Sequence, residues 1–385
     1  MKAIPYGRQC ISQEDIESVI AVLKSEYLTQ GPVIKEFEDD FARYVGAKHA
    51  VAVSNGTAAL HLSALALNVN NASNVITTPI TFAASANCIK YCGGNVYFVD
   101  IDPETWVMDI DKLEKLILSK PPNFFSGVIP VDFAGYAVNT EKIKQLAEKH
   151  NMWIIEDACH APGAYFLNAN NEKVFCGSGK YSDLTIFSFH PVKHITSGEG
   201  GMITTNNDDL YKKLILLRSH GITKQSKDLY ENHGGWYYEM QTLGFNYRLT
   251  DLQAALGKSQ LKRADDGLQR RREIAAKYHH AFKNNSKIIK QSVLEDGHAF
   301  HLYVIQVVER KNLFDFLRTK AIYCQIHYIP VHLQPYYKLM GYKKNDFPIA
   351  EAYYETCISL PMFPTLTSDE QALVIQLITE YINGS

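Results

Sequence analysis

The sequence predicts an α/β protein built on a mostly parallel sheet that helices cover on both faces. Short runs of apolar, β-branched residues alternate with stretches of helical period such as DIDKLEKLILSK and NTEKIKQLAEKH. The runs are mostly apolar and do not alternate with polar residues, as in strands that are buried on both faces. The predicted strands, in chain order, are residues 51–54, 75–79, 96–100, 127–132, 153–157, 184–189 and 201–205.

The chain is also long enough for two domains. Its 385 residues exceed what one compact core usually holds. A long helical pattern starts at Asp251, and fewer elements follow it. These are strands over residues 301–308 and 323–329 and a helix from Asp369. We predict a large α/β domain over residues 1–250 and a smaller α+β domain over residues 251–385.

The composition is that of an ordinary globular protein. Its formal net charge of −2 gives no electrostatic reason to expect nucleic acid or an anionic membrane as a partner. The seven cysteines form no CxxC pair and no repeated spacing, which predicts a reducing compartment and neither a disulfide framework nor a metal site. Because the sequence contains no signal-like segment and no apolar run that could span a bilayer, we expect a cytoplasmic protein.

Ligands of such sheets bind at the carboxyl ends of the strands. The first of these ends carries SNGTAAL, where Gly56 and Thr57 open a helix with free backbone N–H groups. Free amides at the positive end of a helix dipole suit a phosphate, although a plain helix cap by Ser54 or Asn55 needs no ligand. No GxGxxG follows the first strand and no GxxxxGK[ST] occurs, which disfavours dinucleotide and P-loop sites.

A second strand end, in WIIEDACHAPGA, carries a carboxylate. Asp157 closes a buried strand, where an unpaired charge is costly. It either caps the following turn or pairs with a buried cation, and such a pair is worth roughly 4 kcal/mol before desolvation. That is enough to keep a ring nitrogen protonated. His160, three residues later, either faces the same space or packs as a hydrogen-bonded core residue.

A third strand end leads into FSFHPVKHITSGEGG, in which Lys193 stands between aromatic and small residues. Most lysines lie on the surface and have no chemical role. A phosphate cradle, a buried aspartate and a lysine at the strand ends of one sheet are, however, the three contacts that pyridoxal 5′-phosphate requires. Burial would leave the amine a usable nucleophile near neutral pH. Phe82, in TPITFAASAN, either stacks on the cofactor ring or packs in the core.

Eight segments of the chain match one enzyme family. They are LTQGPVIKEFE, SNGTAALHL, TTPITFAASAN, EDACHAPGA, FSFHPVKHITSGEGG, RSHGI, GFNYRLTDLQAALG and QIHYIPVHLQPYY. Together they resemble the DegT/DnrJ/EryC1/StrS family of sugar-nucleotide aminotransferases, within fold type I of the pyridoxal phosphate enzymes. The resemblance runs from about Pro5 to the final helix and is most specific around Asp157 and Lys193. Within the family, the sequence is most similar to the pseudaminic acid branch.

The resemblance implies a role for each matching cofactor residue. Lys193 matches the lysine that bonds covalently to the cofactor and then moves a proton between cofactor and substrate. Asp157 matches the partner of the pyridine nitrogen, and Phe82 matches the residue stacked on the ring. The matching phosphate contacts are Gly56, Thr57 and Ser188. Relatives with histidine in place of this lysine are dehydratases, so Lys193 favours transamination.

The resemblance also implies an assembly and a substrate region. Asn246 matches an asparagine that reaches the phosphate in the other subunit's site, so we expect a homodimer with shared active sites. His160 stands where many members carry glutamine near the cofactor's O3′, which leaves its contact open. The matching positions near the sugar nucleotide are Tyr6, Arg248, His327 and Tyr328. Alternatively, Tyr6 only anchors the amino-terminal arm and HYIP is an ordinary strand.

The implied reaction moves an amino group from L-glutamate to C4 of a UDP-linked 4-keto-6-deoxy-N-acetylhexosamine. Other functions stay open. A bacillosamine- or perosamine-like C4 aminotransferase would use another nucleotide-linked 4-keto-6-deoxy sugar. A dehydratase or epimerase on the same cofactor would give no net amino transfer, and a regulator of the same fold would give no turnover. A nicotinamide-dependent sugar enzyme is disfavoured because the glycine fingerprint is missing.

Overall fold

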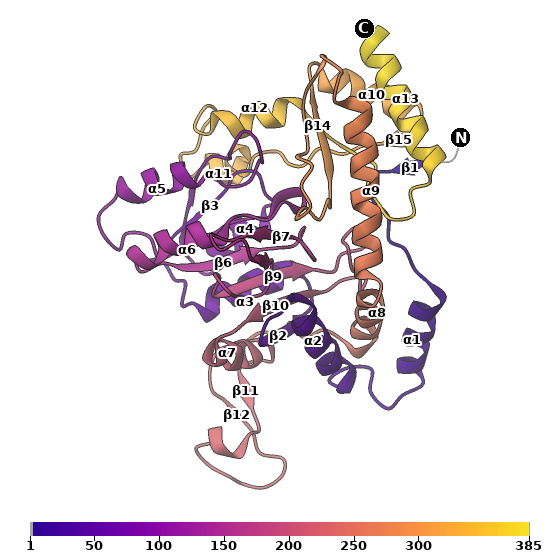
Figure 1. Ribbon diagram of the computed structural model, residues 1–385. Coiled ribbons are helices and arrows are strands. Elements are labelled where there is room, and N and C mark those ends of the chain that lie inside the picture. The colour runs from indigo at the N-terminus through magenta and orange to yellow at the C-terminus, as the bar shows by residue number, and fades with distance from the viewer. Residues whose placement is uncertain (1–2, 385) are drawn as a thin grey trace.

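The computed structural model describes residues 3–384 and is built around one seven-stranded sheet (Figure 1). The strand order is β2-β10-β9-β6-β5-β3-β4. The bounds are β2 His49–Val53, β3 Asn74–Thr77, β4 Asn95–Phe98, β5 Gly127–Ile129, β6 Trp153–Asp157, β9 Leu184–Ser188 and β10 Gly201–Thr205. All seven predicted strands lie in this sheet, which confirms the predicted fold class.

Six of the seven strands run in the same direction. Only β10 is antiparallel, and it lies between β2 and β9. The other pairs, β3–β4, β3–β5, β5–β6 and β6–β9, are parallel. A parallel neighbour needs a long crossover, whereas residues 189–200 form a direct loop between β9 and β10. The carboxyl ends of six strands and the amino end of β10 therefore meet at one edge of the sheet.

Helices cover both faces of the sheet because alternate residues of each strand point to opposite sides. On β6, Ile155 belongs to the core with α3, α4 and α7, whereas Ile154 belongs to the core with α5 and α6. By the same alternation Glu156 faces the α5–α6 side and Asp157 faces the α3 side. The helix bounds are α2 Pro32–Val45, α3 Gly56–Ala66, α4 Ala84–Tyr91, α5 Ile110–Leu118, α6 Thr140–Lys149 and α7 Asp208–Arg218.

The helical pattern that starts at Asp251 forms two helices and not one. α8 (Asp251–Leu261) packs against α1 (Gln13–Leu23) and α2, and α9 (Ala264–Phe282) runs into the C-terminal part. Arg263 lies at the break with a non-helical φ of −113°. Its guanidinium binds the buried Asp15 carboxylate at 2.6 Å, and Gln260 donates to the same carboxylate at 2.6 Å. This contact between α1 and α8 stabilises the break.

The C-terminal part holds a three-stranded antiparallel sheet in the order β13-β14-β16. The bounds are β13 Ile288–Gln291, β14 Tyr303–Val307, β16 Cys357–Leu360, α10 Arg310–Thr319, α11 Pro335–Lys338, α12 Pro348–Thr356 and α13 Ser368–Gly384. The predicted strand over residues 323–329 is wrong for most of its length, since only β15 (Ile322–Tyr323) is a strand. Beyond it, Gln325 forms a single bridge to Ser359, and the following residues line a cavity instead.

The amino terminus lies with these C-terminal elements. β1 (Ile4–Pro5) pairs in parallel with β15, and Ile4 belongs to the same hydrophobic core as α9, α10 and α13. Figure 1 shows β1 beside β15, far from β2. The domain boundary between residues 250 and 251 stays a prediction.

Two short hairpins were not predicted. One pairs β7 (Tyr165–Leu167) with β8 (Lys173–Phe175), and the other pairs β11 (Ile222–Thr223) with β12 (Glu239–Met240). Strands of two or three residues are too short to carry an alternating pattern. The segment with β11 and β12 projects from the body of the molecule (Figure 1). We call residues 222–243 the projecting arm.

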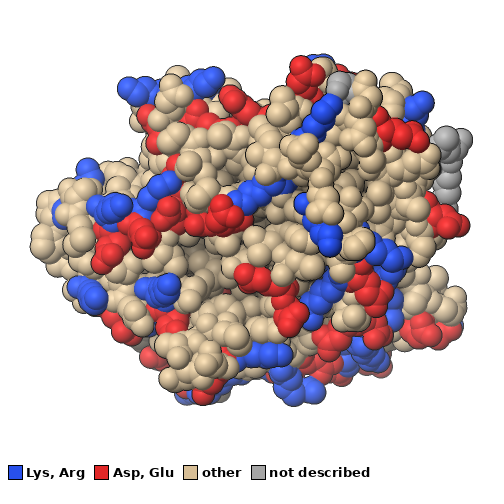
Figure 2. Space-filling model, turned by 45° about the horizontal axis from the view of Figure 1, so that its top comes forward, with Lys and Arg blue, Asp and Glu red and all other residues tan. Residues whose placement is uncertain are grey.

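Acidic and basic side chains are interspersed on the face of the molecule shown in Figure 2. The whole chain carries 39 Lys and Arg against 41 Asp and Glu, so the formal charges nearly cancel. A mixed surface of this kind produces no strong field of one sign. No helix within residues 3–384 is both long and apolar enough to cross a membrane.

Candidate active site

A cavity of about 670 Å³ opens where the parallel strands end. Its walls come from the segments after β2, β3, β6 and β9 and from the chain after β15. Ten of the twelve predicted site residues line it: Tyr6, Gly56, Thr57, Phe82, Asp157, His160, Ser188, Lys193, His327 and Tyr328. The structure therefore brings together residues that are spread over more than 320 positions of the sequence.

Helix α3 begins at this cavity with free backbone amides. Its N-cap is Asn55, whose side-chain oxygen accepts a hydrogen bond from the Ala58 N–H at 2.8 Å. Of the two residues considered as caps, Asn55 and not Ser54 has this role. Within the described chain, the N–H groups of Gly56 and Thr57 have no hydrogen-bond partner. Amides at the positive end of a helix are suited to an anion.

Close approach of the backbone explains two glycines beside these amides. A Cβ atom on Gly56 would lie 3.1 Å from Ser188 Cβ and 3.5 Å from Cys159 Sγ. A Cβ atom on Gly201, at the start of β10, would lie 2.5 Å from the Asn55 carbonyl oxygen. The first turn of α3 is thus packed against β9 and β10, and the Ser188 side chain lies next to the free amides.

Asp157 is the buried acid of the cavity. It closes β6 with 5% of its surface exposed. One carboxylate oxygen accepts a hydrogen bond from Ser85 Oγ at 2.6 Å, and the other accepts one from the Cys159 N–H at 3.2 Å. Ser85 comes from α4 and was not predicted, because no local pattern connects it to a residue 72 positions away. These donors fix the carboxylate while it still lines the cavity.

Lys193 lies in the loop between β9 and β10 and is half-buried. Its backbone N–H donates to the His190 carbonyl at 2.9 Å and so closes a tight turn. The Lys193 side chain lines the cavity. Burial lowers the pKa of the Lys193 amine from its usual value, and the Arg271 guanidinium lowers it further. The acids Cys159 and Asp157 oppose this shift without cancelling it. An amine of lowered pKa has more of the neutral, nucleophilic form.

His160 is a buried, neutral imidazole in this structure. Its Nδ1 accepts a hydrogen bond from the Ala134 N–H at 3.3 Å, so the proton of the neutral ring is assigned to Nε2. Nε2 lies 3.3 Å from the Tyr328 hydroxyl. Burial lowers the pKa of His160 well below its usual value, and the nearby Lys193 amine lowers it further. His160 therefore both faces the cavity and packs in the core.

Three aromatic side chains, Tyr6, Phe82 and Tyr328, and the His327 imidazole line one wall of the cavity, which we call the outer wall. The ring of Tyr6 lies 5.3 Å from that of His327, whose Nδ1 is 2.9 Å from Ser359 Oγ. Burial, together with Lys193, lowers the pKa of His327 to about 3, so this imidazole is neutral as well. Phe82 is 63% exposed and its ring lies 6.2 Å from that of Tyr328. Phe82 is thus mostly exposed to solvent and is not packed in the core.

Asn246 and Arg248 lie outside the cavity. Asn246 is exposed and forms a backbone bridge with Ser219, while Arg248 forms one with Val53 at the end of β2. Only Tyr247, between them, lines the cavity. Their contacts in a neighbouring subunit stay a prediction.

The residues of the cavity fit pyridoxal phosphate. The amides of Gly56 and Thr57 would hold a phosphate, in a cradle that a Cβ atom on residue 56 would narrow. Asp157, already held by Ser85, would pair with a protonated ring nitrogen. The Lys193 amine would supply the covalent attachment.

Comparison with known proteins gives the same assignment. The DegT/DnrJ/EryC1/StrS aminotransferase family matches residues 9–379. The UDP-4-amino-4,6-dideoxy-N-acetyl-beta-L-altrosamine transaminase of Campylobacter jejuni serotype O:2 is 39% identical over 93% of this chain and 92% of its own length. The spore coat polysaccharide biosynthesis protein SpsC of Bacillus subtilis is also 39% identical, over 99% of this chain and 98% of its own length.

Solved structures agree with the fold over the whole chain. PseC of Helicobacter pylori, an aminotransferase of pseudaminic acid biosynthesis, superposes with a TM-score of 0.90 at 31% identity and covers 100% of both chains. Spr1654 of Streptococcus pneumoniae, solved in a PLP form, superposes with a TM-score of 0.89 at 29% identity and covers 100% of this chain and 99% of its own. The chain belongs to the DegT/DnrJ/EryC1/StrS aminotransferase family and is a pyridoxal phosphate-dependent sugar aminotransferase.

Proposed function

We propose that the enzyme transfers the amino group of L-glutamate to C4 of a UDP-linked 4-keto-6-deoxy-N-acetylhexosamine, in a pathway of the pseudaminic acid type. The observation that carries this proposal is the convergence of Lys193, Asp157 and the free amides of α3 on one cavity. The named C. jejuni and H. pylori proteins support the choice of sugar.

Pyridoxal phosphate, when bound, supplies the carbonyl carbon and the electron-withdrawing ring that amino transfer requires. Gly56, Thr57 and Ser188 would bind its phosphate, and Asp157 would hold a proton on the ring nitrogen. The Lys193 amine, of lowered pKa, would take and return the proton that moves during transfer. Phe82, which is exposed at the cavity, would contact the ring.

The substrate region lies on the outer wall. Tyr6, His327 and Tyr328 offer a phenol, a neutral imidazole and a second phenol to the sugar nucleotide. The two phenols can each donate and accept a hydrogen bond, and burial raises the pKa of both, so they stay protonated at neutral pH. A site that uses hydrogen bonds rejects analogues sharply. We expect tighter selection at C4 than at the nucleotide.

A panel of substrates tests this assignment. The purified enzyme is supplied with L-glutamate and with UDP- or dTDP-linked 4-keto-6-deoxy sugars of the L-arabino and D-xylo hexulose series. Preference for the UDP-linked, N-acetylated L-arabino ketone is expected. Preference for the D-xylo isomer would assign a bacillosamine-like role, and activity on C3 ketones alone would refute the proposal. Formation of 2-oxoglutarate separates an aminotransferase from a dehydratase or a regulator.

We also propose that the enzyme works as a homodimer with composite sites. Asn246 is exposed and outside the cavity of its own chain, as a residue that serves a partner must be. The projecting arm exposes Tyr230 (88%) and Trp236 (75%), and large apolar side chains in such positions favour a protein contact. Arg248, two residues after Asn246, would also contact the site of the partner subunit.

Mixing two inactive variants tests the composite site. Lys193→Ala and Asn246→Ala chains are combined under conditions that allow exchange of subunits. Activity should return to at most about a quarter of the wild-type value, because half of the dimers are mixed and each holds one intact site. Lys193→Ala mixed with itself is the control. A fully active monomer would contradict the proposal.

The cytoplasm is the proposed location. All seven cysteines are free thiols in the structure, as expected for a protein of a reducing compartment. A cell fraction that retains this activity after membranes and periplasm are removed would support the location.

A further inference from the structure

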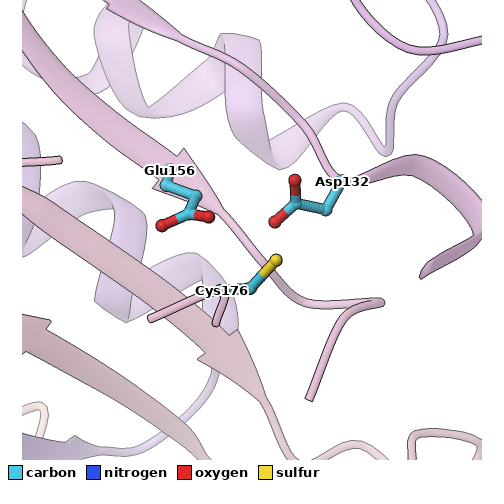
Figure 3. Close-up of side chains that lie close together, drawn as sticks. All are labelled: Asp132, Glu156 and Cys176. Atoms are coloured by element: carbon cyan, nitrogen blue, oxygen red, sulfur yellow. The ribbon is translucent and has the colours of Figure 1, made fainter. Parts of the chain in front are cut away.

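Three acidic side chains meet on the face of the sheet opposite the cavity (Figure 3). Glu156 comes from β6, Asp132 follows β5, and Cys176 follows β8. The potential ligand atoms of the three lie within 4.8 Å of one another, and all three residues are buried. Figure 3 shows their side chains pointing toward a common point. The proposed reaction uses none of them.

Charge makes this cluster unusual. In the described chain, no Lys, Arg or His side chain forms a hydrogen bond or an ion pair with any of the three. The charges of Glu156 and Asp157 both raise the pKa of Asp132, and Asp132 in turn raises the pKa of the Cys159 thiol. Two buried carboxylates without a counter-ion cannot both be ionised at low cost.

The hydrogen bonds identify which carboxylate keeps its charge. Glu156 Oε2 accepts from Thr185 Oγ1 at 2.7 Å, from Ser182 Oγ at 3.2 Å and from the Gly177 N–H at 3.4 Å. Several donors on one oxygen stabilise the ionised form. Burial raises the pKa of Glu156 as well, but these donors oppose the shift, whereas the pKa of Asp132 is raised well above its usual value. We therefore assign the charge of the cluster to Glu156.

Asp132 has the environment of a neutral acid. Its Oδ1 accepts from the Val138 N–H at 2.8 Å, but Oδ2 has no partner apart from weak contact with the Cys176 thiol. Burial, and then the Glu156 charge, raise the pKa of Asp132 well above its usual value. A proton on Asp132 would remove one of two buried negative charges whose carboxylate oxygens lie within 4.8 Å of each other. Burial raises the pKa of the Cys176 thiol as well, so it stays protonated.

We propose that Asp132 and Glu156 form a carboxyl–carboxylate pair that shares one proton, held on Asp132, and that this pair positions His160 in the active site. The geometry that carries this is the convergence of two buried carboxylates, one with several donors and one with a free oxygen. The positioning part rests on the proposed function of the cavity.

A continuous set of contacts connects the pair to the cavity. The Asp132 N–H donates to the Asp157 carbonyl at 3.0 Å, and its side chain closes the segment 133–138 through the Val138 N–H. Within that segment Ala134 has a positive φ of 58° and donates its N–H to His160 Nδ1. Asp132 thus fixes the segment that contains Ala134, and Ala134 orients His160. We therefore class Asp132 as a positioning residue.

Infrared spectroscopy of the wild-type enzyme tests the shared proton directly. At neutral pH, surface carboxyl groups are ionised, so the C=O stretch of a protonated acid reports buried carboxyl groups. This band should disappear in Asp132→Asn and persist in Cys176→Ala. Elemental analysis of the same samples should find no stoichiometric transition metal. A band that survives in Asp132→Asn refutes the assignment, as does one bound metal per chain that Cys176→Ala loses.

The pH dependence of the melting temperature tests whether Asp132 holds a proton in the folded enzyme. A folded-state pKa above the unfolded value of about 3.9 contributes stability that is lost as pH rises through the folded pKa. The wild-type Tm should therefore fall relative to that of Asp132→Asn, whose amide mimics the neutral acid, as pH rises from about 4 toward the raised folded pKa of Asp132. A constant difference in Tm across this range contradicts the shared proton. Neither measurement needs cofactor or substrate, so failure here is distinct from failure of the proposed function.

Rescue tests the positioning role. Asp132→Ala should lower kcat several-fold and change the pH profile of kcat, because Ala134 and His160 lose their support. Asp132→Asn keeps an acceptor for Val138 and should recover most of that loss at neutral pH. If Asp132→Ala folds and has an unchanged kcat and pH profile, the link to His160 is wrong. Cys176→Ala is the matched control, since it removes a buried side chain from the same cluster and leaves the pair intact.

Discussion

Two consecutive residues of β6, Glu156 and Asp157, show how one strand serves two environments. Both are buried carboxylates, but they point to opposite faces of the sheet. Asp157 accepts from Ser85 and Cys159 and lines a cavity that also holds the amine of Lys193. Glu156 accepts from hydroxyl groups in a closed core beside a second acid. The same functional group is thus the proposed cofactor contact on one face of the sheet and the proposed structural charge on the other.

The largest effect should come from removing the amine on the cavity side. Lys193→Ala removes the amine that we propose bonds to the cofactor and moves the proton, so turnover with the proposed donor L-glutamate should fall to background. The free energy of unfolding should change little, since Lys193 has no role in the core on the Glu156 side. Turnover near the wild-type value would contradict the assignment. Cofactor absorbance and denaturant unfolding, measured on the same sample, separate loss of chemistry from loss of fold.

Exchange of each carboxylate for its amide compares the two faces directly. Asp157→Asn keeps the shape but removes the charge that would hold a proton on the ring nitrogen. We expect kcat to fall roughly 100- to 1,000-fold, the range seen when a preorganised electrostatic contact is lost. Steady-state kinetics with saturating cofactor measures this change.

Glu156→Gln should affect stability more than kcat. Its amide group removes the charge that the hydroxyl groups of Ser182 and Thr185 stabilise. Loss of a buried charged acceptor of this kind costs about 1–3 kcal/mol of unfolding free energy. Urea unfolding measures it. If Glu156→Gln lowers kcat as much as Asp157→Asn does, the division between the two faces is wrong.

The smallest effect at neutral pH should come from His160, which contacts both sides through Ala134 and Tyr328. Its folded-state pKa lies well below the usual 6.5 because of burial. A lowered histidine pKa contributes stability that is present above pH 6.5 and is lost as pH falls. His160→Gln removes this loss. Its free energy of unfolding should therefore exceed that of the wild type by about 1.4 kcal/mol for each pH unit below 6.5.

Unfolding of the wild type and His160→Gln at several acidic pH values checks that slope. His298→Gln, at another buried histidine whose pKa burial lowers to about 3, is a control that lies outside the cavity. An equal gain in both variants is expected if burial alone causes the shifts. A slope in His160→Gln equal to that of the wild type would show that His160 is already protonated in the folded enzyme.

Local sequence patterns were enough to predict the sheet. Mostly apolar runs predicted all seven strands because strands covered on both faces bury nearly all of their side chains. Asp157 and Lys193 were predicted as site residues because Asp157 closes such a run, Lys193 follows one, and the carboxyl ends of parallel strands meet in space. The family motifs around them added the roles that spacing alone left open.

The residues that complete these sites from distant positions could not be predicted from local patterns. Ser85 holds Asp157 across 72 positions, and Asp132, Glu156 and Cys176 meet from three separate segments. The loss of strand structure after Tyr323 and the break between α8 and α9 also depend on contacts with residues far away in the chain. Local patterns report which face of an element is buried, because burial follows the period of the element. They do not report what lies opposite, because that is set by how the layers pack against one another.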